Sequence, residues 1–353
     1  MKLAILPIIA GAVFGILAPL LVVWGNPPNM GVCAACFMRD ISGALGLHSA
    51  AVVQYLRPEI FGIVLGAFVS ALVFREFRPR GGSAPFVRFM LGFFGIIGAL
   101  VFLGCPWRAL LRLAGGDLSA IAGILGLIAG ILGGSLFVRG GYSLGRSNNM
   151  SHFAGLVFVL LMLALLVFAF VKLSDPEWSL IRESAKGPGS NHAPLALSLV
   201  AGLVIGALFQ KSRFCTVAAI RDPFLFKDTR ILQGVLSALI VAALMNIALG
   251  QFHLGFAPQP IAHNDWLWNF LGMLLAGLCF GLGGGCPGRQ LIFSGEGDSD
   301  AAIFLLGGFV GAAMAHNFAL ASSAAGITAN APIAVGIGLA FCLCVGFLNR
   351  ARE

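Results

Sequence analysis

Cysteines and arginines recur together in four short stretches of this chain, each at the edge of a long apolar run. The stretches are GVCAACFMRD, GCPWR, RFCTVAAIRD and GGGCPGR. A thiol is a soft, polarisable group with a weak S–H donor, and a guanidinium is a strong hydrogen-bond donor to anions. Together they suit a small anion that has a soft sulfur or selenium atom and hard oxygens. The residues that could carry this chemistry are Cys33, Cys36, Arg39, Cys105, Arg108, Cys215, Arg221, Cys286 and Arg289.

Other uses of cysteine fit this pattern less well. A zinc site needs four nitrogen or sulfur ligands at fixed spacing, but Ala218 stands where RFCTVAAIRD would need a counterpart of Cys36. We therefore expect no metal and no cofactor. A thioredoxin-like redox pair would need a soluble βαβ unit, although a membrane thiol enzyme that uses Cys33 and Cys36 remains an alternative. We expect only helix packing from the cysteines inside unbroken apolar segments, Cys279, Cys342 and Cys344.

The bulk composition is that of a membrane protein. Of the 353 residues, 59% are hydrophobic and 10% are charged, and the mean hydropathy is +0.96. A soluble domain has too few buried positions for so many apolar residues, whereas apolar runs of roughly 20 residues, the length that spans a bilayer, recur along the chain. The first run resembles a signal peptide but has no small-residue cleavage site before GNPPN, so we interpret it as a retained span.

We predict an all-α polytopic fold with about ten spans. Two of them, residues 58–74 and 195–210, are short for a full crossing. The approximate limits of the ten apolar runs are 3–23, 58–74, 86–104, 118–138, 152–172, 195–210, 231–250, 266–284, 301–319 and 331–348.

Membrane topology explains the formal charge of +8 better than nucleic-acid binding does. With the N-terminus inside, 15 of the 22 lysines and arginines fall in inner loops or tails, where the positive-inside rule concentrates them. We therefore expect both termini in the cytoplasm and no nucleic-acid partner. The basic residues assigned to the inner side are Lys2, Arg75, Arg78, Arg80, Arg88, Arg139, Arg146, Lys211, Arg213, Arg221, Lys227, Arg230, Arg289, Arg350 and Arg352.

The four cysteine stretches form two similar pairs. Superimposing the Arg-Asp dipeptide of the first stretch on that of the third places Cys33 on Cys215, an offset of 182 residues. Superimposing CPWR on CPGR places Cys105 on Cys286, an offset of 181 residues. Two independent motifs with nearly one offset indicate a tandem duplication.

A polar stretch at residues 173–194 lies at the middle of the chain, and we interpret it as an outer linker between the two copies. It separates a first membrane repeat, residues 1–172, from a second, residues 195–353. Each repeat carries five predicted spans, and an odd number inverts the second copy. Inverted repeats form single transport units whose substrate path lies at the repeat interface. The motifs of Cys33 and Cys105 would then face the outer side, and those of the second repeat the inner side.

The same motifs mark places where helices break. Pro106 and Pro287 directly follow cysteines, and proline removes a backbone donor and disfavours a helical residue before it. Broken or re-entrant helices occur in membranes only where protein buries them or where they line a wet cavity. Because free helix N-termini favour anions, these breaks are expected to line the substrate path.

In that order the motifs CAACFMRD, GCPWRALLRLAGGDL, RFCTVAAIRD and GGGCPGRQLIFSGEGD resemble those of the YeeE/YedE sulfur-transport family, over nearly the whole chain. GCPWRALLRLAGGDL, with PPNMGVCAACFMRDISGALGLH before it, is most similar to the YedE branch, described as a selenium-metabolism membrane protein and selenium transporter. Members of the wider family take up thiosulfate along a narrow path of cysteines that pass the substrate by S–H···S contacts. The resemblance implies relay roles for Cys33, Cys105 and Cys286, with Cys215 as repeat partner and Cys36 as an extra thiol.

These observations predict a transporter of the bacterial inner membrane rather than an enzyme. It would take up a small inorganic sulfur- or selenium-containing species, a thiosulfate-like anion or a selenium compound, through a cysteine-lined central path. Trp107, which stands where CPGR has a glycine, would narrow one side of this path. No G-x-x-x-x-G-K-[ST] motif is present and carboxylates within spans are sparse, so we favour a channel-like path.

Besides the substrate and membrane lipid, a cytoplasmic sulfur- or selenium-carrier protein is a candidate partner, at the polar inner loop RGGYSLGRSNNMSH of residues 139–152. A purely structural subunit of a larger complex remains a third functional class, and it predicts that the cysteines tolerate substitution.

Overall fold

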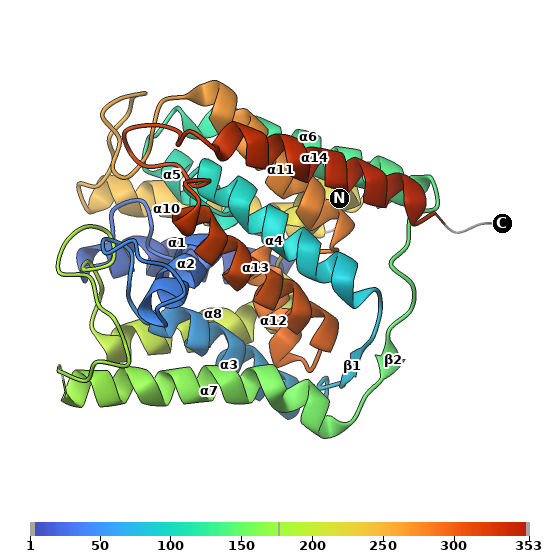
Figure 1. Cartoon of the computed structure of the whole chain (residues 1–353), viewed down its shortest axis with the longest axis horizontal. Helices are drawn as coiled ribbons and strands as arrows, with labels where there is room; N and C mark the ends of the chain where they lie inside the picture. Colours follow the sequence, from blue (N-terminus) through green and yellow to red (C-terminus); the bar gives the residue numbers. More distant parts are fainter. Residues whose placement is uncertain (1–3, 176, 351–353) are drawn as a thin grey trace.

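The computed structural model describes residues 4–175 and 177–350. The first half of the chain is helical apart from two short antiparallel strands, β1 (Arg80–Gly81) and β2 (Asn148–Asn149), which pair at one end of the molecule (Figure 1). Its helices are α1 (Ile5–Val23), α2 (Ala34–Ala44), α3 (Pro58–Val73), α4 (Pro85–Val101), α5 (Pro106–Ala114), α6 (Ala120–Arg139) and α7 (His152–Ser174).

The second half of the chain has the same order of long and short helices. The short ones, α9 and α12, follow a long helix directly, and their lengths of 11 and 9 residues equal those of α2 and α5. The helices are α8 (Leu195–Ser212), α9 (Thr216–Phe226), α10 (Arg230–Ala248), α11 (Trp266–Leu282), α12 (Pro287–Gly295), α13 (Ser299–Asn317) and α14 (Ala331–Leu348).

The prediction of an all-helical protein that crosses the membrane many times is confirmed. In the described part of the chain, nine helical segments are long and apolar enough to span a bilayer, with α4–α5, α8–α9 and α11–α12 each taken as one segment. The one remaining predicted span, residues 58–74, is the shorter apolar helix α3. Its 16 residues extend about 24 Å at 1.5 Å per residue, less than the roughly 30 Å of a hydrocarbon core.

Among the described helices, the four pairs with the most extensive packing each join the two halves. Helix α1 packs along α10, α3 along α8, α4 along α13 and α6 along α11, and Figure 1 shows α4 and α13 side by side. Glycines bring these backbones together, as in other membrane helix pairs. A Cβ at Gly92 would lie 1.9 Å from the Phe304 carbonyl oxygen, and one at Gly206 would lie 2.1 Å from that of Ile63. The two halves therefore form one packed body.

Loops that the sequence assigns to the inner side meet at the β1–β2 end of the molecule. Arg80 in β1 pairs with Asp298 at 2.8 Å, and the Ser143 amide donates to the Asn349 carbonyl at 3.0 Å. The α3–α4, α6–α7 and α12–α13 loops and the residue after α14 are thus tied together on one face. The outer linker lies elsewhere, against the loop between α2 and α3.

The glycine contacts predict a pair of opposite mutational effects. Gly92→Ala should lower the Tm of the purified protein by several degrees, because overpacking a close contact costs about 1–3 kcal/mol. Gly336→Ala in α14 should leave the Tm unchanged or raise it, since no atom of the described residues lies within 4 Å of the added methyl. Thermal unfolding in detergent measures both, and equal effects would contradict the packing described for α4 and α13.

Candidate functional site

Each of the four short helices begins directly after a cysteine of the predicted site. Cys33 precedes α2, and its sulfur accepts a hydrogen bond from the Cys36 amide at 3.3 Å. Cys215 precedes α9 in the same way, and its sulfur accepts from the Ala218 amide at 3.5 Å. Side-chain acceptors at this position satisfy amides that have no partner within the helix. The thiols therefore help to satisfy the backbone amides at the start of each helix, where the break ends.

The other two short helices begin at a cysteine followed by proline. Cys105 and Cys286 are extended residues, and the prolines after them take the first helical position, where a missing N–H costs nothing. Two residues earlier, the chain turns through a left-handed conformation, with φ +64° at Leu103 and +84° at Gly284. Glycine adopts this conformation freely, whereas leucine is strained in it.

The first-half cysteines form one group, which we call the outer thiol group after the side that the sequence predicts for it: Cys33, Cys36 and Cys105. The sulfurs of Cys33 and Cys105 lie 3.6 Å apart, and the Cys105 amide donates to the Cys33 sulfur at 3.5 Å. The Cys36 thiol lies 3.7 Å from the Leu103 carbonyl oxygen and 3.5 Å from Arg108 Nη1. All three cysteines are buried.

Arg108 holds the wall of the outer thiol group together. Its guanidinium donates to the carbonyl oxygens of Asn29 (3.2 Å), Ile261 (2.9 Å) and Leu103. Among the described residues it has no carboxylate within ion-pair distance, and it is fully buried. Asp117, the nearest acid in its sequence, pairs with Arg112 instead, at 2.6 Å. A buried positive charge beside three thiols favours an anionic ligand.

The second-half cysteines, Cys215 and Cys286, form a pair that we call the inner thiol group after its predicted side, and their thiols lie close enough to interact. A pocket of about 190 Å³ reaches this group, and Cys215, Arg221 and Arg289 line it. Arg289 lies 3.4 Å from the Glu296 carboxylate. Three arginines and one carboxylate, that of Asp222, line the pocket itself, so positive charge exceeds negative charge there. Two further arginines share the Glu296 carboxylate, and each also pairs with a second one, Glu76 or Asp298. These arginines are Arg213 at 2.8 Å and Arg80 at 3.7 Å from Glu296.

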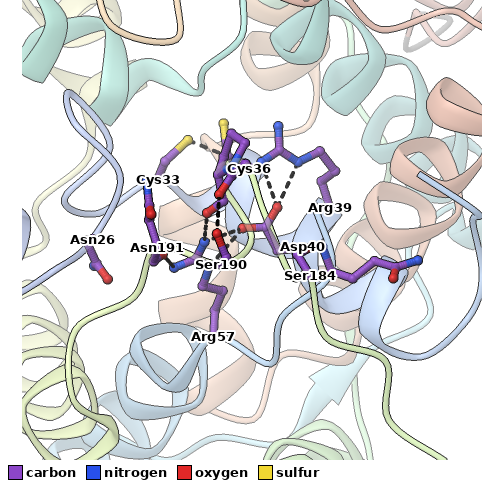
Figure 2. Close-up of polar contacts among 12 residues, drawn as sticks. Asn26, Cys33, Cys36, Arg39, Asp40, Arg57, Ser184, Ser190 and Asn191 are labelled. Carbon is purple, nitrogen blue, oxygen red and sulfur yellow. Dashed lines mark hydrogen bonds and ion pairs between the residues drawn. The ribbon is translucent and has the colours of Figure 1, made fainter. Parts of the chain in front are cut away.

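The Arg-Asp dipeptides make local ion pairs in both halves but in different surroundings. Arg39 and Asp40 pair at 2.6 Å and are both buried, whereas Arg221 and Asp222 pair at 2.8 Å and remain 29% and 20% exposed. Figure 2 shows a second arginine on the other side of Asp40. This residue is Arg57, at 2.8 Å. Two buried arginines thus share one carboxylate close to the outer thiol group.

Arg57 also fastens the outer linker to the protein. Its guanidinium donates to the carbonyls of Asn191 (3.0 Å) and Pro188 (2.8 Å), and the Ser184 amide donates to the Gln54 carbonyl at 2.9 Å. Figure 2 shows the linker passing over Asp40 and Arg57 at this point. The linker therefore covers the buried charges of Arg39, Asp40 and Arg57.

A histidine in the loop before α11 closes another part of the outer wall. His263 Nε2 lies 2.8 Å from the Val101 carbonyl oxygen, at the end of α4. Burial lowers the pKa of His263 below its ordinary value, so the ring is neutral at pH 7. This loop belongs to the second half of the chain and lies against the first-half site.

The structure thus divides the residues singled out in the sequence into two groups. The outer group brings together Cys33, Cys36, Cys105 and Arg108, and Arg39 lies in the ion pair beside it. The inner group brings together Cys215, Cys286, Arg221 and Arg289. Sequence reasoning overlooked Arg57 and Arg112, which are both fully buried. Arg112 stands four residues after Arg108, on the same face of α5, and that spacing was an available signal. Nothing in the sequence near Arg57 pointed to Asp40.

Part of this chain is similar to known sulfur-transport proteins. Residues 211–348 match the family model described as Sulphur transport. The chain is also 30% identical over 99 residues to the thiosulfate transporter TsuA of Escherichia coli (strain K12) and 31% identical over 104 residues to that of Spirochaeta thermophila. These alignments cover 28% of this chain and 28–29% of each relative. The resemblance to a sulfur-transport family is thus confirmed over residues 211–348, and the selenium branch remains a prediction.

The two Arg-Asp pairs provide a matched test of the buried charges. Asp40→Ala leaves Arg39 and Arg57 without a carboxylate and should destabilise the protein by about 3–5 kcal/mol. Asp222→Ala removes a partly exposed pair and should cost less than about 1 kcal/mol. Thermal unfolding of the two variants in one detergent compares them. Equal losses of Tm would contradict the burial difference between the two copies.

Proposed function

We propose that this protein transports a small inorganic anion containing sulfur or selenium across the bacterial inner membrane, through a central path lined by its cysteines. The observation that carries the proposal is the placement of Cys33, Cys105, Cys215 and Cys286. All four stand at the starts of short helices in a multi-pass membrane protein, and they are grouped in two buried clusters with surplus arginine. The family match and the thiosulfate-transporting relatives support the same substrate class.

The chemistry of the two clusters suits an anion such as thiosulfate. Its terminal sulfur is soft and can accept weak S–H contacts from the thiols, while its oxygens accept hydrogen bonds from Arg108 or Arg289 and from free amides. Weak contacts at successive sites allow release as well as binding, which conduction requires. Sulfate has the oxygens but no soft atom, so it should be a poor substrate.

We also propose that residues 1–172 and 195–353 are inverted repeats joined by the linker 173–194. The shared order of long and short helices supports this, as do the four helix pairs that each join one half to the other. In this arrangement the outer thiol group opens toward the periplasm and the inner group toward the cytoplasm.

The location of the charges supports an orientation with both termini in the cytoplasm. Four of the seven basic residues that the sequence assigned to the outer side are buried inside the protein and do not face the outer water. They are Arg39, Arg57, Arg108 and Arg112. The β1–β2 end, where the basic inner loops meet, would then be cytoplasmic. We place the carrier-protein contact on the exposed tip of the loop between α6 and α7, residues 145–147. Unchanged uptake after replacing this tip with a Gly/Ser segment would argue against the contact.

Uptake by proteoliposomes that contain only this protein tests the proposed function. Wild type should accumulate labelled thiosulfate or selenite in preference to sulfate, and Cys105→Ala and Cys286→Ala should each reduce that uptake at least tenfold. The control is Cys344→Ala, because Cys344 is exposed on α14, outside both thiol groups. Uptake that survives both site substitutions would overturn the cysteine path, and equal uptake of sulfate would overturn the soft-atom selectivity.

Cys36→Ser separates the transporter from a membrane thiol enzyme. An enzyme that relies on a Cys33–Cys36 pair loses all function when Cys36 becomes serine. The transporter should lose less uptake with Cys36→Ser than with Cys105→Ala, because Cys33 still contacts Cys105 directly. The measurement is the initial uptake rate of the two variants side by side, at matched protein content.

A further inference from the structure

The two proline-started helices meet at their first turns. Trp107 of α5 and Gly288 of α12 hold the same place in the motifs CPWR and CPGR. A Cβ added at Gly288 would lie 2.1 Å from Cζ2 and 2.3 Å from Cη2 of Trp107. The indole ring therefore lies directly on the Gly288 backbone, one turn from a cysteine of each thiol group. The absence of a side chain at Gly288 makes room for the ring.

Aromatic side chains enclose the same ring from the other sides. Phe14 and Phe209 lie 5.6 Å and 5.4 Å from the Trp107 ring, centroid to centroid. Phe209 stacks on Phe214 at 4.0 Å, and Phe214 directly precedes Cys215. This aromatic cluster thus extends from the residue after Pro106 to the residue before Cys215, across the space between the outer and inner thiol groups. Its members are Phe14, Trp107, Phe209 and Phe214, all at most 1% exposed.

The indole nitrogen is anomalous in this setting. Trp107 is 1% exposed, yet its Nε1 has no hydrogen-bond partner among the described residues. A buried donor without a partner costs free energy, and buried tryptophans usually find one. Phenylalanine, which fills the other positions of the cluster, would pack here without burying an unpaired donor. An anion that passes the ring would accept a hydrogen bond from this donor.

We infer that Trp107 is the barrier between the outer and inner thiol groups, and that its indole N–H is the donor that an anion meets as it passes from Cys105 to Cys286. The donor role rests on the proposed function, whereas the barrier role does not require transport. In the state described here the barrier is closed, because the ring is in contact with Gly288. Passage requires the ring to swing off Gly288, which the glycine permits without moving a side chain of its own.

Thiol accessibility tests the barrier without any transport assay. Vesicles of each membrane orientation are treated with the small anionic reagent sulfonatoethyl methanethiosulfonate, and modification of each cysteine is followed by peptide mass spectrometry. In wild type, reagent on the side of the Arg213–Arg221 pocket should modify Cys215 and leave Cys105 protected. Trp107→Gly, which turns CPWR into CPGR, should raise the rate at Cys105 from that side at least tenfold.

Matched variants separate a barrier from general loosening. Phe280→Ala opens a cavity at an equally buried ring that packs against Phe304, and it should leave Cys105 protected. Unchanged labelling of Cys215 and an unchanged Tm show that Trp107→Gly remains folded; where it does not, Trp107→Leu takes its place in the same assay. Protection of Cys105 in the folded variant, or equal labelling of Cys105 and Cys215 in wild type, would overturn the barrier.

Trp107→Phe tests the donor, because it keeps a ring and removes only the N–H. Cys105 should remain protected, while the KM for thiosulfate uptake should rise about tenfold, as expected for a lost hydrogen bond to a charged group, with little change in maximal rate. An unchanged KM would overturn the donor role and leave the barrier standing. If wild type takes up no anion, the proposed function and the donor role both fail, and the labelling result alone decides the barrier.

Discussion

The centre of this protein depends on how backbone amides and carbonyls find hydrogen-bond partners where the helices break. Within a membrane, amides and carbonyls freed by a break have no water to bond. Here the break before α2 is closed partly by the Cys33 sulfur, and the break before α5 by Arg108, which collects three carbonyl oxygens. The same groups that stabilise the breaks are those that we propose bind a soft anion. The structure and the proposed substrate chemistry therefore depend on the same atoms.

Buried charge is the second consequence of this arrangement. A desolvated arginine is costly unless it is paired or hydrogen-bonded. The outer cluster meets that cost by placing Asp40 between Arg39 and Arg57, and by tying Arg57 to linker carbonyls. The inner copy leaves Arg221 and Asp222 partly exposed, beside a pocket. The two ends of the molecule thus differ in access although their motifs are alike.

The membrane fold was predictable because its cause is local. Apolar runs of span length, prolines after cysteines and a nearly constant offset between motifs can all be read without knowing any long-range contact. They led to the helical multi-pass protein and to helix ends at Cys105 and Cys286, within a few residues of those observed. The span predicted at residues 58–74 is present as a helix, but α3 is shorter than a full crossing because it ends before Arg75, whose backbone is left-handed.

The membrane setting, the helix breaks and the residue types gathered at them can be read from the chain alone. Which groups meet depends on the folded structure: Cys33 with Cys105, Arg57 with Asp40, and Trp107 with Gly288. The difference comes from sequence separation. Hydropathy and turn chemistry act over a few residues, whereas these contacts join segments that only the packing of one half against the other, or of loops against helices, brings within reach.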